Sequence, residues 1–354
     1  MKIIWGILIL CIIVVSHELG HFLIAKLNGI EVKEFDIGFG PKIFGIKKGG
    51  TEYCLRVIPL GGACVFDDFE DAGEDADMAT LIANSSYRQA NVWARIATTV
   101  AGPMFNFLLA FILGLFLMQY INMPPAVITE VTEGSVAEEA GLQAGDRIIK
   151  INGSRVYLYP EVSMAIQLGY GEPLKLTYER EGKDYSVELI PKMNEEYGYY
   201  MIGVGFGGYE EEDTSALSVI KNSYLYVRYM VKMTFSSLRM LFTGQAAVSD
   251  LSGPVGAVSV VSEEYDSAKE MGTLAVVVSM LNIALLLSAN LGVVNLLPIP
   301  ALDGGKLVLL LVEAVRGKPV DAKMEGIIQM IGVGLLLLLM VVVMYNDIAR
   351  LFTG

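Results

Sequence analysis

Four long apolar stretches constrain this chain more than any other feature, because each is long enough to cross a lipid bilayer. They cover residues 3–27, 92–121, 273–297 and 325–345 and consist mainly of Leu, Ile, Val and Met. About 20 apolar residues span the hydrocarbon core. The first stretch is too long for a signal-peptide core and shows no convincing cleavage site, so we interpret it as a span. The sequence predicts a polytopic α-helical membrane protein with about four transmembrane helices.

The composition agrees with this interpretation and excludes other classes of protein. Hydrophobic residues make up 53% of the chain and charged residues only 18%, whereas about 25% is typical of soluble domains. The net charge of −13 argues against a nucleic-acid-binding protein, which would present a basic face. Cys11, Cys54 and Cys64 form no Cys-x-x-Cys pair and no even disulfide framework.

The segments between the spans predict the remaining domains. Residues 1–122 would form the first half of a membrane core, with a Gly-rich, membrane-associated β region at 30–66 and an acidic loop at 67–77. Residues 124–208 hold short alternating strands separated by turns, which is typical of a small β-rich domain. Residues 215–243 combine helical apolar spacing with four basic residues and predict an amphipathic helix. Residues 252–354 would complete the membrane core.

The distribution of basic residues predicts the orientation of the chain. Lys and Arg are frequent between the first two spans and between the last two, whereas Lys2 alone precedes the first span. Short loops rich in basic residues stay in the cytoplasm. We therefore expect both of these segments to be cytoplasmic, and the N-terminus, the β-rich domain and the C-terminus to lie outside.

The first span contains a metal-binding pattern, His17-Glu18-Leu19-Gly20-His21, which holds the only two histidines of the chain. Histidines four residues apart share one face of a helix, where both can bind one Zn²⁺ while the adjacent Glu activates a water at the open zinc position. The alternative is that these side chains merely face a polar interior. Polar residues at this depth are costly and favour the zinc interpretation. His17 lies about 21 Å along the helix from residue 3, in the cytoplasmic half of a core about 30 Å thick.

A catalytic zinc needs a third protein ligand, and Asp303 is the strongest candidate. It is the only acidic residue between residues 272 and 313 and follows a stretch broken by Pro298 and Pro300. Irregular backbone at membrane depth is tolerated where it is buried or lines a cavity. A carboxylate that extends to the cytoplasmic interface is the alternative role for Asp303, and Glu313 and Cys11 are weaker candidates for the ligand.

Two amides in the third span are further candidates for the site. Asn290 and Asn295 are five residues apart and could stabilise a developing oxyanion or hold substrate backbone. Helix–helix hydrogen bonding explains the same spacing equally well.

Together these motifs give the chain a family resemblance. The first-span motif and Asn295-Leu-Leu-Pro-Ile-Pro-Ala-Leu-Asp303-Gly resemble those of the site-2 protease family of intramembrane zinc metalloproteases, and more narrowly the bacterial regulator-of-sigma-E protease group. Weaker matches are Gly38-Phe-Gly-Pro41, Ile58-Pro-Leu-Gly-Gly62, Ala101-Gly-Pro-Met-Phe-Asn106 and Ser252-Gly-Pro-Val-Gly256. Residues 140–153 resemble part of a single PDZ domain.

The resemblance implies roles for individual residues. His17, His21 and Asp303 would bind one Zn²⁺, and Glu18 would be the general base that activates the zinc-bound water. Asn290 and Asn295 match positions that handle the substrate. The loop 38–62 matches a region that pairs with an extended substrate strand.

The resemblance also implies a function in regulated intramembrane proteolysis. The enzyme would be a multi-pass protein of the bacterial inner membrane that hydrolyses peptide bonds within single-span membrane proteins. Its substrates would be anti-sigma factors or remnant signal peptides, usually after a first cut by another protease. The active site would lie towards the cytoplasm, and the PDZ domain would lie outside as a size filter or docking module. The alternatives are a non-catalytic scaffold that binds exposed C-termini through its PDZ domain, and a tethered soluble-type peptidase.

Overall fold

The computed structural model describes residues 2–66, 86–121, 123–207, 215–245 and 253–353. The predicted acidic loop at 67–77 lies outside the described residues. The chain divides into two compact units, one of residues 1–113 and 234–354 and the other of residues 114–233.

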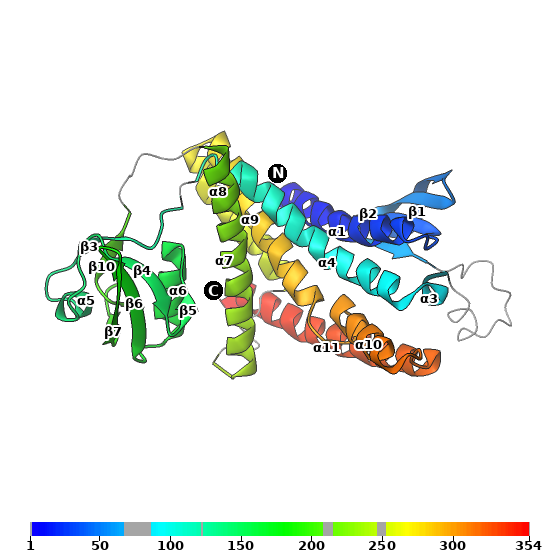
Figure 1. The fold of residues 1–354 in the computed structure, drawn as a ribbon. Coiled ribbons are helices and arrows are strands. Elements are labelled where there is room, and N and C mark those ends of the chain that lie inside the picture. The colour runs from blue at the N-terminus through cyan, green and yellow to red at the C-terminus, as the bar shows by residue number, and fades with distance from the viewer. Residues whose placement is uncertain (1, 67–85, 122, 208–214, 246–252, 354) are drawn as a thin grey trace. The chain divides into compact units, whose positions relative to one another are not determined.

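Within the described residues, four helices are long and apolar enough to cross a membrane. They are α1 (Lys2–Leu27), α4 (Val92–Leu117), α9 (Thr273–Asn295) and α11 (Ala322–Thr353). The candidate span in α11 runs from Ala322 to Ala349. The prediction of an α-helical integral membrane protein with about four spans is thus confirmed (Figure 1).

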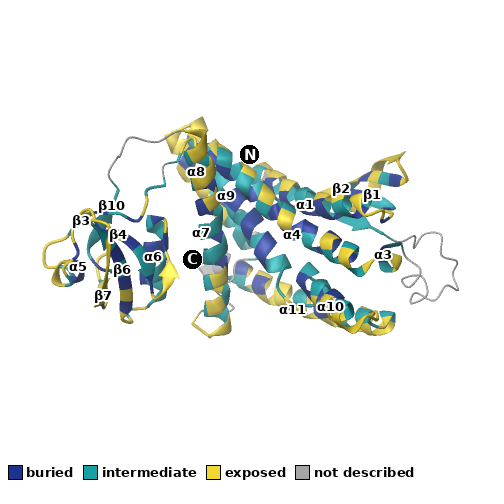
Figure 2. Cartoon of the chain, in the orientation of Figure 1, coloured by how far each residue is buried: buried dark blue, intermediate teal, exposed yellow. Residues whose placement is uncertain are grey.

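The spans of the first unit pack closely where their side chains are smallest. Gly20 of α1 faces α4, and a Cβ atom there would lie 2.4 Å from the Ala101 carbonyl oxygen. Only a glycine permits this approach, because real Cβ atoms do not come so near to backbone. Farther along α1, a buried apolar cluster joins it to α9 and α8 (Pro254–Met271), and it includes Ile13 and Met280. In contrast, much of α11 is exposed (Figure 2).

A β-hairpin lies beside α1 and forms the predicted β region. Its strands are β1 (Glu34–Lys48) and β2 (Thr51–Val65). The start of β1 pairs on one side with residues 52–55 and on the other with residues 62–65, so β2 contributes two separate segments to the sheet. Phe35, for example, lies between Tyr53 and Cys64. The segment 62–65 is an edge strand, and it is the part of the hairpin that reaches the site described below.

Among the described residues, the first unit also contains the helices α3 (Ser86–Gln89), α8 and α10 (Asp303–Arg316). The sequence did not predict them as separate elements, because α8 carries too many charges for a span and α10 follows the proline-broken segment. Glu313 of α10 forms a two-pronged ion pair with Arg95 of α4, both largely buried. Asp347 of α11 accepts hydrogen bonds from the N–H groups of Gly253 and Gly256 at the start of α8. These contacts fix the short helices to the spans.

The second unit contains the predicted β-rich domain. A four-stranded antiparallel sheet has the order β5-β4-β6-β7, and two-stranded pairs join β3 to β10 and β8 to β9. The elements are β3 (Ile128–Val131), α5 (Val136–Glu139), β4 (Arg147–Ile151), β5 (Ser154–Arg155), α6 (Tyr159–Leu168), β6 (Leu174–Arg180), β7 (Lys183–Leu189), β8 (Lys192–Asn194), β9 (Tyr199–Met201) and β10 (Val204–Phe206). Alternate residues of β6, such as Leu174 and Leu176, face a core shared with Val162 of α6.

A buried carboxylate joins this domain to the helix that follows it, α7 (Ala216–Phe242). Glu161 of α6 has no exposed surface, and its Oε2 lies 3.0 Å from Arg228 Nη1 and 2.9 Å from Lys232 Nζ, both on α7. Its Oε1 also accepts the N–H groups of Tyr157 and Leu158. Burial alone would raise the pKa of Glu161, but the hydrogen bonds from Lys232, Tyr157 and Arg228 outweigh it and lower that pKa. The carboxylate is therefore ionised at neutral pH and holds the basic face of α7.

Candidate active site

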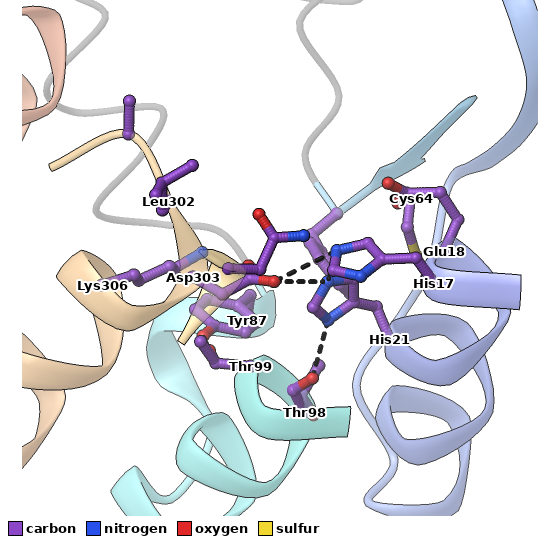
Figure 3. A pocket seen from close by; sticks show the side chains of 13 residues that line it. His17, Glu18, His21, Cys64, Tyr87, Thr98, Thr99, Leu302, Asp303 and Lys306 are labelled. Atoms are coloured by element: carbon purple, nitrogen blue, oxygen red, sulfur yellow. Dashed lines mark hydrogen bonds and ion pairs between the residues drawn. The ribbon is translucent and has the colours of Figure 1, made fainter. Parts of the chain in front are cut away.

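A cavity of about 350 Å³ in the first unit brings together the polar residues of the membrane core. Its walls come from α1, the end of β2, α3, α4, the end of α9 and the start of α10 (Figure 3). The lining residues are His17, Glu18, His21, Cys64, Phe66, Tyr87, Thr98, Thr99, Asn295, Ala301, Leu302, Asp303 and Lys306. The three residues predicted to bind zinc (His17, His21 and Asp303) and the predicted general base, Glu18, are among them.

The two histidines reach the cavity from one face of α1. One helical turn separates them, and both are less than 10% exposed. Their Nε2 atoms lie 3.1 Å apart, and the rings meet edge to face. The i, i+4 spacing thus aims the same nitrogen of each ring at one point.

Asp303 is the first residue of α10, and its carboxylate lies beside the two Nε2 atoms. Pro298 and Pro300 interrupt the chain before it, and the Ala301 N–H is held by the Gln329 side chain of α11 at 2.6 Å. Asp303 Oδ2 lies 3.1 Å from His17 Nε2 and 3.3 Å from His21 Nε2. The Oδ2 atom itself is buried and has no hydrogen-bond partner among the described residues.

The three converging atoms have the chemistry and spacing of a zinc site. A tetrahedral zinc ion with bonds of about 2.0 Å keeps its ligand atoms about 3.3 Å apart. The observed separations of 3.1, 3.1 and 3.3 Å match this edge length. Two imidazoles and one carboxylate also match the donor set of a catalytic zinc, which keeps its fourth position open.

Helix α4 supplies the groups that contact the Nδ1 atoms of the two histidines, and no sequence pattern predicts these contacts. His21 Nδ1 lies 2.8 Å from the carbonyl oxygen of Thr98, and His17 Nδ1 lies 3.2 Å from the amide nitrogen of Asn106. Pro103 lies between them and has no N–H to donate to the Thr99 carbonyl four residues earlier. Asn106 belongs to the motif 101–106, which already matched the family. Its contact with His17 could not be predicted, because that contact depends on how α4 crosses α1.

A glycine on α4 makes room for both imidazoles and provides a test of the packing. A Cβ atom on Gly102 would lie 2.3 Å from His21 Nε2 and 2.8 Å from His17 Cε1. We expect Gly102→Ala to displace the rings, weaken zinc binding and lower the cleavage rate about 100-fold, as an error of about 1 Å in position can do. Zinc stoichiometry and cleavage of a tagged single-span protein would be measured together. Gly334→Ala in α11, where nothing lies within 4 Å, is the matched control, and equal zinc content and rate in both variants would contradict the expectation.

Glu18 lies in the same cavity beside the edge strand of the hairpin. A Cβ atom on Gly62 would lie 3.2 Å from Glu18 Cγ, so the strand passes close to this side chain. Burial, with a further contribution from the negative charge of Glu18, raises the pKa of the Cys64 thiol to about 12.

The two asparagines of α9 have different surroundings. Asn295 lines the cavity, whereas Asn290 is not among the lining residues. The Oδ1 atom of Asn290 accepts a hydrogen bond from Thr234 Oγ1, on the part of α7 that belongs to the first unit. This interhelical bond is the contact expected from helix packing.

The structure does not bring the weaker candidates for the third ligand to the cavity. Glu313 is held by Arg95, and Cys11 is a free, partly exposed cysteine on α1. Neither residue lines the cavity.

Comparisons with known proteins show which proteins this chain resembles. A profile of peptidase family M50 matches residues 5–339. The zinc metalloprotease RasP of Geobacillus kaustophilus is 33% identical, with 96% of each chain covered. The regulator of sigma-W protease RasP of Bacillus subtilis is 31% identical, with 98% of each chain covered. Among solved structures, the PDZ domain of an SdrC-like protein from Listeria monocytogenes covers 24% of this chain and 90% of its own length, with 21% identity and a TM-score of 0.22.

Proposed function

Because the chain belongs to peptidase family M50, we propose that it hydrolyses peptide bonds within the transmembrane segments of single-span membrane proteins. The observation that supports this most directly is the convergence of His17, His21 and Asp303 beside Glu18 in a cavity of the membrane core. The predicted family, the zinc metalloprotease activity and the zinc cofactor are confirmed by the family match, the relatives and this cluster. The individual ligands and the substrate are proposals.

The side chains divide the chemistry between them. A zinc ion bound by the two Nε2 atoms and Asp303 Oδ2 would supply Lewis-acid polarisation of the scissile carbonyl and of the attacking water. The Glu18 carboxylate would take a proton from the water as it attacks the carbonyl carbon, and pass it to the amide nitrogen as the C–N bond breaks. Asn295 lies in the same cavity and would hold the substrate backbone or the developing oxyanion.

The edge strand 62–65 would present the substrate to these groups. A transmembrane helix hides its peptide bonds within its own hydrogen bonds, so it must be extended before it is cut. The edge strand pairs with residues 34–37 on one side, and Cys64 lies both in this strand and in the cavity wall. An extended substrate segment added along the strand would bring its backbone beside Glu18.

The cellular role follows from the predicted orientation. We place the active site towards the cytoplasm and the small β-rich domain outside the cell membrane of a bacterium. Proposed substrates are anti-sigma-factor-like proteins or remnant signal peptides, cut after another protease has removed the outer part. The small domain would act as a PDZ-type size filter or docking module. The Bacillus subtilis relative is named as a regulator of sigma-W protease, which supports the anti-sigma-factor class.

The proposal is tested on full-length protein purified in detergent. We expect one zinc ion per chain and cleavage within the span of a tagged single-span protein that lacks its outer domain. A strong zinc chelator should stop cleavage and added zinc should restore it. The same substrate with a bulky folded outer domain is the matched comparison for the filter, and should be cut more slowly. Absence of zinc, or no cleavage of several such substrates, would instead support a scaffold that binds exposed C-termini.

A further inference from the structure

Asn106 is a fully buried side chain on α4 that faces one of the two histidines. Its exposed fraction is 0%, and its amide lies 3.2 Å from His17 Nδ1. Its backbone carbonyl accepts a hydrogen bond of 2.8 Å from Ser288 Oγ of α9. The residue therefore stands where α1, α4 and α9 meet, on the far side of the His17 ring from Asp303.

The partner of the other histidine shows what a metal-binding ring requires. The Thr98 carbonyl can only accept a hydrogen bond, so His21 Nδ1 must carry the proton when the two atoms bond. This leaves a lone pair on His21 Nε2, the atom that faces Asp303 Oδ2. A hydrogen bond on the far nitrogen thus fixes the tautomer that a metal needs.

His17 needs the same tautomer, and the amide of Asn106 can provide it in only one of its two orientations. With Nδ2 towards the ring, His17 Nδ1 has to accept, and the proton moves to Nε2, where it would block a metal. With Oδ1 towards the ring, Nδ1 donates and Nε2 is free. Oδ1 has no hydrogen-bond partner among the described residues, so no contact of the oxygen holds the amide in the first orientation.

We propose that Asn106 is a positioning residue for zinc binding, whose Oδ1 accepts the Nδ1–H of His17 and holds that ring with Nε2 towards the metal. The proposal rests on the proposed function, since it requires His17 to be a zinc ligand. It assigns α4 one role towards both histidines, through a backbone carbonyl for His21 and a side-chain amide for His17.

Three substitutions separate this role from simple packing. Asn106→Asp keeps an acceptor of the same shape but removes the donor. Asn106→Leu keeps the side-chain volume but removes both the hydrogen-bond acceptor and the donor. Ser288→Ala removes the buried hydrogen bond to the Asn106 backbone and leaves its side chain intact, so it is the matched control. If Asn106 only packs, the Leu variant should bind zinc better than the Asp variant, because burying a carboxylate is costly. If Asn106 acts as proposed, the Asp variant should bind zinc better than the Leu variant.

The experiment measures the zinc dissociation constant of the full-length protein in detergent, by competition with a chelating indicator, for wild type and each variant. We expect Asn106→Leu to bind zinc 10–100-fold more weakly, and Asn106→Asp and Ser288→Ala to stay within about threefold of wild type. The visible absorption of bound Co²⁺ should be the same in Asn106→Asp as in wild type.

Several results would overturn the proposal. Wild-type affinity in Asn106→Leu, or weaker binding in Asn106→Asp than in Asn106→Leu, would show that the acceptor is not what matters. If the Leu variant does not fold, a loss of tenfold or more in the Asp variant decides against the proposal by itself. His17→Ala separates the two levels of the argument: zinc retained in that variant would remove the proposed function as well, whereas zinc lost there but kept in Asn106→Leu would remove only the role of Asn106.

Discussion

Glu18→Gln is expected to lower the rate of substrate cleavage about 10⁴-fold while one zinc ion stays bound to each chain. Glutamine has nearly the same shape as glutamate but cannot take a proton from water at neutral pH. The three proposed ligands are unchanged, so the metal should remain. The measurement pairs zinc stoichiometry with the rate of cleavage of a single-span substrate without its outer domain.

The control for this prediction changes an exposed carboxylate in the same way. Glu133 lies in the turn before α5 of the small domain, where its side chain is exposed. Glu133→Gln should leave both the zinc content and the cleavage rate unchanged. Cleavage by Glu18→Gln at the wild-type rate would mean that another group is the base. Loss of zinc from this variant would mean instead that Glu18 helps to hold the metal.

Asp303→Ala is expected to remove both zinc and activity. The substitution leaves two imidazole ligands for an ion that takes three protein ligands in catalytic sites. The loss of affinity should therefore exceed the 10–100-fold that follows when only a hydrogen-bond partner of a ligand is removed. Equilibrium dialysis against buffered zinc would measure the affinity, and the cleavage assay the activity.

Asp184→Ala, an exposed aspartate on β7 of the small domain, is the matched control and should bind zinc normally. Normal zinc occupancy in Asp303→Ala would show that the third ligand is a different residue. It would also reopen the candidates Glu313 and Cys11, although neither lines the cavity in this structure.

The membrane spans were predictable from the sequence because hydropathy over about 20 residues is a local property. The predicted stretch 273–297 and α9 (Thr273–Asn295) begin at the same residue. Helix α8 was not predicted, since its acidic residues, such as Glu263 and Glu264, give no hydropathy signal. The pairing of β1 with two parts of β2 could not be predicted from the sequence either, because alternating residues fit either register equally well.

The histidine pair of the site was predictable for a similar reason, since the i, i+4 spacing on one helix places both rings together. Asp303 was identified by elimination, as the one acidic residue in an apolar region. The roles of Asn106 and Thr98 could not be predicted, because they depend on the crossing of α1 and α4. That crossing is set by the absence of side chains at Gly20 and Gly102, which no local pattern reveals.

The distance along the chain between the proposed ligands has a consequence for how the protein is made. His17 and His21 are synthesised before Asp303, which follows His21 by 282 residues. At about 5–20 residues per second, roughly 15 to 60 s separate these events. Helix α1 therefore leaves the ribosome well before all three proposed zinc ligands have been synthesised. A nascent chain would carry no working protease before Asp303 has been added, and newly inserted neighbouring proteins would be safe from it until then.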